Sequence, residues 1–425
     1  MNDNIVEVRE VLEFTKKLVN NLDYYINISN EFVQDIQKEQ LLDKLVAETS
    51  LLLLLVNRLP QRYELSSQVS EIANKLDRYA RSARHLLILS SNPQAVVGVA
   101  LPHIILNKIG LKNNIFDDLV DTAFSSKFVW SIDRPNFRQM EMRWLQGLFK
   151  DIQPDFSDLL PCSLLMQPLH PVYMRREDAY AATHAVMYLT NFGESGLSHV
   201  VNLKRIESFS EHSISWCLAY MDWDLLAEIL IVHLLAGCQE SSFYITASLI
   251  MRHIFKKNTV MPGLNHNHEV YDQLENNKKT AYRDIQGYHS TYVYGILRVL
   301  ELVCNPNQSV NSEVCGISSS DSYSEHGVRL NIQEILEYAR DKFSSDWLTS
   351  FINTENLGNC EVFLNSRLIY RAREGEFGKL LIDIESYESS GMKRVMETCG
   401  VASEKVIQFL RATAYKKNTE STCLN

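Results

Sequence analysis

The sequence predicts an all-α protein, and two observations support this class. Gly and Pro contribute only 16 and 10 of the 425 residues, too few for the many tight turns of a sheet-rich chain of this length. Apolar residues recur at helical spacing over long stretches, most regularly after residue 175. We therefore expect helical hairpins arranged as an α/α toroid-like domain, preceded by an amino-terminal helical part.

The amino-terminal region, residues 1–150, reads as a succession of amphipathic helices. They are expected at 5–26, 31–58, 66–90, 96–107, 115–124 and 136–148. Four prolines between residues 154 and 171 then predict an extended connection. We place the boundary between the two parts here.

The second region, residues 151–425, is expected to alternate helices with loops. Its helices are expected at 176–190, 208–220, 224–235, 242–255, 279–304, 330–343, 347–351, 361–386 and 391–414. An α/α toroid gives this alternation, with every second helix lining the centre and a polar pocket there. A solenoid of helical hairpins gives the same alternation, and no fixed-period consensus selects a standard repeat family. Two polar loops, 256–277 and 305–327, are long enough to be lids or disordered segments.

Composition limits the partners and the compartment. The net charge of −10 opposes binding to nucleic acid, which relies on Lys and Arg to neutralise phosphates. The eight cysteines include no Cys-x-x-Cys pair, so we expect reduced thiols rather than disulfides. The amino terminus lacks the basic start and apolar core of a secretory signal. We expect a cytoplasmic protein that binds no nucleic acid and no membrane, with homo-oligomerisation left open.

Three histidines occur at nearly regular spacing along the second region. His184, His233 and His289 lie in apolar helical stretches, 49 and 56 residues apart, close to one helical hairpin per step. An array of hairpins would bring them near one another. Imidazole suits Zn and Fe, so the three are candidate metal ligands, although no His-Glu-x-x-His signature accompanies them. Acid/base chemistry without a metal is the alternative.

The first of these helices carries a polar stripe. Tyr180, His184 and Tyr188 are four residues apart and share one face, with Thr183 beside them. Such a row on an apolar helix must find polar partners or line a wet cavity. We predict that His184 is catalytic and that the substrate-binding residues of this segment are Tyr180, Thr183, Tyr188 and Asn191.

The second helix contains a conspicuous charge. Glu228 stands within a run of Leu, Ala and Ile, and a buried carboxylate has a raised pKa unless it is paired, which suits a general acid or base. A structural ion pair is the alternative. Asp224, one turn earlier, is predicted to bind substrate. His233 shares a face with Asp222, three turns before it, so we expect His233 and Glu228 to face different objects.

The third helix begins with another polar group. Gln286, His289 and Tyr292 share one face at the start of a long apolar helix, and Tyr288 lies on a neighbouring face. This arrangement is typical of a pocket lining. We predict that His289 is catalytic and that Tyr288 and Tyr292 bind substrate.

Three motifs resemble those of uncharacterised bacterial all-α proteins associated with specialised-metabolite gene clusters. They are Tyr180-x-x-Thr-His184-x-x-x-Tyr-x-Thr-Asn-Phe-Gly193, Asp224-Leu-Leu-Ala-Glu228 and Tyr288-His-Ser-Thr291. The resemblance covers about residues 175–302, and Asn191 stands where that pattern commonly has Asp. It implies a bacterial cytoplasmic setting and supports His184, Glu228 and His289 as the centre of a site, but it implies no particular activity.

These observations together predict an enzyme of bacterial specialised metabolism. It would act on a small metabolite or a peptide, by acid/base or metal-assisted chemistry, in a pocket of the helical barrel. The alternative is a non-catalytic helical scaffold that binds a peptide or a partner protein, with the histidines hydrogen-bonded in its core.

Overall fold

The computed structural model describes residues 3–29, 38–60, 63–167, 169, 172–197, 201–264, 267–304, 357–376 and 379–384. The regular elements in these residues are all helical, which confirms the all-α class. The expected helices at 330–343, 347–351 and 391–414 and the expected loop 305–327 lie outside the described residues.

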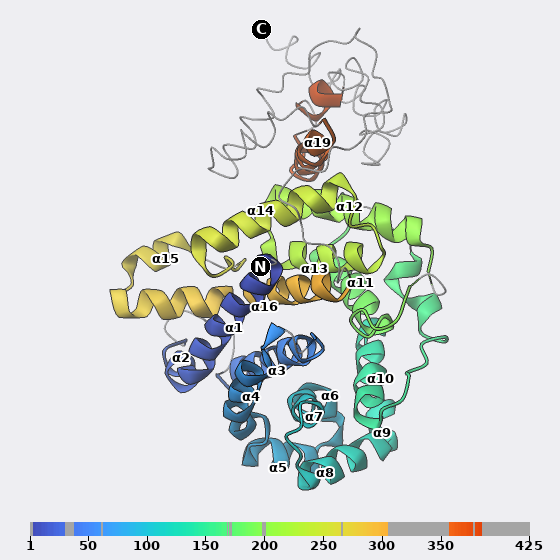
Figure 1. Ribbon diagram of the computed structural model, residues 1–425. Helices are drawn as coiled ribbons and strands as arrows, with labels where there is room; N and C mark the ends of the chain where they lie inside the picture. The colour runs from blue at the N-terminus through green and yellow to red at the C-terminus, as the bar shows by residue number, and fades with distance from the viewer. Residues whose placement is uncertain are drawn as a thin grey trace, which may run out of the picture.

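The amino-terminal region is helical as expected, but several helices are shorter (Figure 1). Its elements are α1 (Asp3–Asn20), α2 (Leu22–Ser29), α3 (Lys38–Asn57), α4 (Ser66–Ala80), α5 (Ala83–Ser91), η2 (Pro93–Ala95), α6 (Val96–Val99), α7 (Leu101–Lys108), α8 (Asn114–Ser125), α9 (Lys127–Trp130) and α10 (Asn136–Lys150). The predicted helix 66–90 is broken because the Ser82 side chain accepts a hydrogen bond from the His85 amide and starts α5 anew. The predicted helix 96–107 is broken where Pro102 enters the first turn of α7.

The second region follows the expected alternation closely. Its elements are η3 (Leu160–Cys162), η4 (Leu164–Met166), α11 (Arg176–Leu189), α12 (Leu203–Tyr220), α13 (Trp223–Leu235), α14 (Ser242–Asn258), α15 (His268–Gln273), α16 (Asn276–Cys304) and α19 (Leu357–Arg373). Helix α19 takes the place of the first part of the expected helix 361–386. Half of the expected loop 256–277 is occupied by the end of α14, by α15 and by the start of α16.

Residues 261–263 of that loop pack against α16. The Met261 amide donates a hydrogen bond to Thr291 Oγ1 at 2.9 Å. A Cβ added at Gly263 would lie 1.8 Å from the carbonyl oxygen of Gln286, so only glycine allows this approach. Residues 261–263 therefore lie in direct contact with α16, with Met261 buried.

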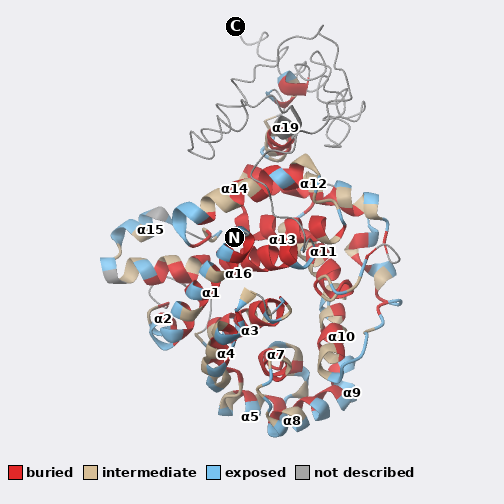
Figure 2. Cartoon of the chain, viewed as in Figure 1, coloured by how far each residue is buried: buried red, intermediate tan, exposed pale blue. Residues whose placement is uncertain are grey.

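Helix α13 is the centre of the core (Figures 1 and 2). Every residue from Trp223 to Leu234 is buried, because α11, α12, α14 and α16 all pack against this helix. A helix that is apolar on all sides is typical of such a central position. Each polar group that α13 carries must therefore find a partner on a surrounding helix.

The two predicted regions share one core. Helices α1 and α3 pack against α16, and buried apolar residues from Ile5 to Ile384 form a single cluster. The boundary near residue 150 and the toroid-like arrangement stay predictions. Among the described residues, no helix has the length and apolar character required to cross a membrane.

Candidate functional site

Four of the predicted residues meet in one cluster with a fifth from the amino-terminal region. His184 Nε2 on α11 lies 3.6 Å from Glu228 Oε1 on α13. His289 Nε2 on α16 lies 3.2 Å from Asp224 Oδ1, also on α13, and His289 Nδ1 lies 3.0 Å from Glu48 Oε2 on α3. We call Glu48, His184, Asp224, Glu228 and His289 the His–carboxylate cluster. Asp224 and Glu228 are one helical turn apart, so each faces one of the two imidazoles.

Glu228 is held from both sides. Its side chain is only 3% exposed, and Thr183 Oγ1 on α11 donates a hydrogen bond to Oε2 at 2.5 Å. The other oxygen faces His184. The carboxylate therefore has a fixed orientation, and Thr183 acts on it rather than standing free for a substrate.

His184 lies between the buried carboxylate of Glu228 and three aromatic rings. Its ring stacks on Phe137 of α10, with centroids 5.9 Å apart and an angle of 28° between planes, and Tyr180 and Tyr188 flank it on α11. The side chain is 27% exposed, while Nδ1 is buried and has no hydrogen-bond partner among the described residues. Burial alone would lower the pKa of His184, but the Glu228 carboxylate outweighs it and raises this pKa. The proton on Nδ1 thus has no acceptor in the described part of the protein.

Asp224 is the most heavily contacted carboxylate. Arg176 Nη2 donates to its Oδ2 at 3.1 Å, and the Tyr180 hydroxyl donates to the same oxygen. Arg176 Nε also donates to Asp222 Oδ2 at 2.6 Å. Burial, with the nearby carboxylates Glu228 and Asp224, raises the pKa of Tyr180 far above its ordinary value, so the phenol remains a hydrogen-bond donor. These contacts join the first turns of α11 and α13.

His289 bridges α3 and α13. Burial would lower its pKa, but Glu48 and Asp224 together raise the pKa to about 9, so the imidazolium form is favoured at neutral pH. Burial would raise the pKa of Glu48, and the charge of His289 lowers it instead. The contact between His289 Nδ1 and Glu48 is an ion pair that is not aligned as a hydrogen bond. Burial, aided by Glu48, raises the pKa of Tyr288 well above its ordinary value, which keeps this phenol protonated beside the bridge.

His233 lies on a different side of α13. Its side chain is fully buried, its Nδ1 lies 2.5 Å from Ser210 Oγ on α12, and its ring stacks on Tyr244 of α14. Burial lowers the pKa of His233 to about 4, so the neutral ring is favoured. This placement agrees with the expectation that His233 and Glu228 face different objects.

The described residues do not bring the three histidines together as one ligand set for Zn or Fe. His184 and His289 contact different carboxylates of the cluster, and His233 contacts α12 and α14. Within the described ranges, no group of three or more His, Cys, Asp or Glu side chains is arranged to hold a metal ion. The spacing of 49 and 56 residues placed the histidines on neighbouring helices but not on a common face.

Asn191 forms a corner rather than a part of the cluster. Its carbonyl accepts a hydrogen bond from Arg58 Nη1 at 2.9 Å, and its Oδ1 accepts one from Trp144 Nε1 at 2.7 Å. Asn191, Phe192 and Gly193 have successive φ angles of 47°, 52° and 89°, a left-handed run that ends α11 abruptly. The corner ties α3 and α10 to the end of α11.

The two remaining predicted tyrosines are packed between helices. Tyr188 is buried against Trp144 of α10, with ring centroids 5.4 Å apart. Tyr292 is buried and accepts a hydrogen bond from Thr49 Oγ1 of α3 at 3.0 Å. Tyr188 borders His184, whereas Tyr292 contacts Thr49 of α3, Phe14 of α1 and Tyr288 of its own helix.

Sequence reasoning missed Glu48, Arg176 and Phe137. Glu48 interrupts the apolar stretch 45–56 much as Glu228 interrupts its own, so the same signal was present in α3. Arg176 follows Arg175 at a helix start, a position typical of a solvated surface. Phe137 carried no signal, because an aromatic residue on an amphipathic helix is most often core.

The fold and the cluster define a helical protein with two buried carboxylates on a central helix, each opposed by a histidine. A family model described as "Domain of unknown function (DUF6895)" matches residues 18–299, and the chain belongs to this family. The matched residues include all five members of the His–carboxylate cluster and extend across residue 150. No curated protein and no solved structure matched the chain.

Proposed function

We propose that the protein is an enzyme that acts on a small metabolite or a peptide by acid/base chemistry at His184. The observation that carries this proposal is the two-sided environment of the ring. Nε2 faces the buried Glu228 carboxylate at 3.6 Å, and Nδ1 has no hydrogen-bond partner among the described residues. A histidine oriented by a carboxylate through one nitrogen, whose other nitrogen is buried without a partner, is suited to exchange a proton with a molecule that displaces the groups covering this nitrogen.

The chemistry follows from these two contacts. Glu228 stabilises the imidazolium, so Nδ1 donates its proton to a basic atom of the substrate and recovers one later in the cycle. Thr183 holds Glu228 in place. Phe137 and Tyr188 form aromatic walls beside the His184 ring, which suits an apolar or planar portion of the substrate.

His289 receives a different role from the one that the sequence predicts. Both of its nitrogens lie within ion-pair distance of carboxylates of this chain, so we assign it to positioning. It fixes Asp224 relative to α3, and Asp224 in turn receives Arg176 and Tyr180. Among the predicted catalytic residues, the proton-transfer role goes to His184, with Glu228 as its orienting partner.

The setting is also part of the proposal. The resemblance of the three motifs to proteins of specialised-metabolite gene clusters supports a bacterial, cytoplasmic enzyme of specialised metabolism. Metal-assisted chemistry is not part of it, because the donor groups of the described residues do not converge on one point.

The scaffold remains the second candidate, and one observation favours it. Arg176 and His289 are engaged with the chain's own carboxylates, so much of the cluster joins helices to one another. A scaffold predicts that these contacts contribute to stability only.

The test is consumption of metabolites. Purified protein is incubated with a bacterial metabolite extract, and mass spectrometry follows which ions disappear and which appear. We expect a substrate–product pair with the wild type that is lost in His184→Gln and Glu228→Gln at unchanged folding, and retained in His253→Gln, a substitution of a histidine on α14. If the wild type converts no metabolite, or if His184→Gln converts as much as the wild type, the proposal of an enzyme is wrong and the scaffold becomes the favoured function.

A further inference from the structure

A second site lies apart from the His–carboxylate cluster, between α12 and the segment that contains η4. It is a cavity of about 310 Å³, and its lining is mainly apolar: Leu165, Gln167, Leu169, Arg205, Ile206, Ser208 and Phe209. Ligand pockets span roughly 300–1,000 Å³, so this volume suits one short chain or one ring.

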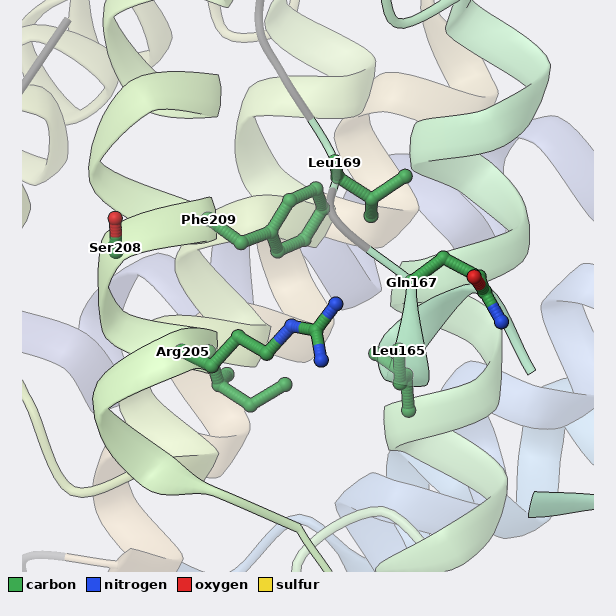
Figure 3. A pocket seen from close by; sticks show the side chains of 7 residues that line it. Leu165, Gln167, Leu169, Arg205, Ser208 and Phe209 are labelled. Carbon is green, nitrogen blue, oxygen red and sulfur yellow. The ribbon is translucent and has the colours of Figure 1, made fainter. Parts of the chain in front are cut away.

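Among the described residues that line the cavity, Arg205 is the basic one. Figure 3 shows the Arg205 side chain extended from α12 toward Leu165 and Gln167, beside the ring of Phe209. Within the described ranges, the Arg205 guanidinium has no ion pair and no hydrogen bond. The residue is half-buried, so this cation is partly removed from water, and no anion of the described part of the chain compensates it.

The sequence around Arg205 supplies no local partner. The positions three and four residues away are Val201 and Asn202, just before α12, and Ser208 and Phe209 on α12, and none of them is acidic. The first turn of α12 contains no acidic residue either, and the Asn202 side chain does not cap it. The chain has a net charge of −10, yet none of the described residues places a carboxylate against this guanidinium.

We infer that this cavity binds a small carboxylic acid with an apolar body. The planar guanidinium matches a carboxylate with two parallel hydrogen bonds. Leu165, Ile206 and Phe209 cover the apolar part of the ligand. The site is independent of His184, because none of its lining residues belongs to the His–carboxylate cluster.

The experiment measures binding of decanoate by isothermal titration calorimetry, with decanol as the uncharged probe of the same length. We expect saturable one-to-one binding of decanoate to the wild type and at least tenfold weaker binding of decanol. Arg205→Gln should weaken decanoate binding by about 10- to 100-fold, the effect of losing a charge-assisted pair. Lys204→Gln, at the exposed neighbouring position, is the matched control and should leave the affinity unchanged.

Each alternative outcome is decisive. No saturable decanoate binding, equal affinity in Arg205→Gln, or decanol binding as tight as decanoate would overturn the inference. Arg205→Lys keeps the charge without the fork, and it should give an intermediate affinity. A peptide with a free carboxy-terminal phenylalanine has the same chemistry, so tighter binding of this peptide than of decanoate would overturn the assignment to a free acid.

Discussion

The bridge between Glu48, His289 and Asp224 predicts that the protein loses stability as the pH rises from neutral to mildly alkaline. The pKa of His289 is about 9 in the folded protein and about 6.5 for an unperturbed histidine. Between these values the folded protein holds a proton that the unfolded chain has released. Stability from this group is therefore complete below about pH 6.5 and is lost as the pH rises through about 9.

The magnitude follows from the shift. A difference of about 2.5 pKa units corresponds to about 3.5 kcal/mol at roughly 1.4 kcal/mol per unit. The slope of the unfolding free energy should thus be about −1.4 kcal/mol per pH unit for this proton within that window. His184 adds to the slope in the same direction, because its pKa is also raised. The raised pKa of His289 and the lowered pKa of Glu48 arise from the same contact, so the stabilisation of about 3.5 kcal/mol is counted once and not for each residue.

The assay is urea unfolding at a series of pH values from 6 to 10, with the wild type and Glu48→Gln. The variant removes the first of the two carboxylates that raise the pKa of His289, so its stability should fall less steeply above pH 6.5. Glu71→Gln, which removes a surface carboxylate paired with Lys16 and Lys75, is the control and should keep the wild-type slope. Equal slopes in wild type and Glu48→Gln would refute the reasoning, as would a His289 ring resonance that titrates near 6.5.

Two further substitutions test the packing around α16. Arg298 is fully buried and pairs with Glu301 at 3.0 Å, whereas Glu7 is also paired with Arg252 at 2.9 Å. Arg298→Met should therefore leave the buried Glu301 carboxylate without its ion pair and cost about 3–5 kcal/mol in urea unfolding. Arg78→Met, in an exposed pair with Asp23, should change little, and a similar loss in both variants would contradict the argument. Gly263→Ala would place a Cβ 1.8 Å from the Gln286 carbonyl oxygen and should lower the melting temperature by several degrees. Gly98→Ala, with open space around the added Cβ, is the control and should leave the melting temperature nearly unchanged. A wild-type melting temperature in Gly263→Ala would show that residues 261–263 do not pack on α16.

The sequence predicted most helices of the described region, because apolar periodicity reports which residues face a core. The breaks at Ser82 and Pro102 depend on local capping and on a missing amide. These signals were present in the chain but were weaker than the continuous apolar pattern around them. Glu48 was missed for another reason. Its contact with His289 joins α3 to α16 across most of the chain, and periodicity carries no information on such a pairing.

The three histidines show where helix spacing stops being informative. Equal steps along the chain predict neighbouring helices, but the direction of a side chain depends on rotation about the helix axis, at about 100° per residue. His233 follows Glu228 by five residues, so the two point about 140° apart, and α13 is buried on all sides. Such a helix has no single inward face: Asp224 and Glu228 contact α16 and α11, and His233 contacts α12. A central buried helix can thus carry polar side chains that contact different neighbouring helices. Where all faces are apolar, the azimuth of each polar residue is therefore a better guide to a shared site than its distance along the sequence.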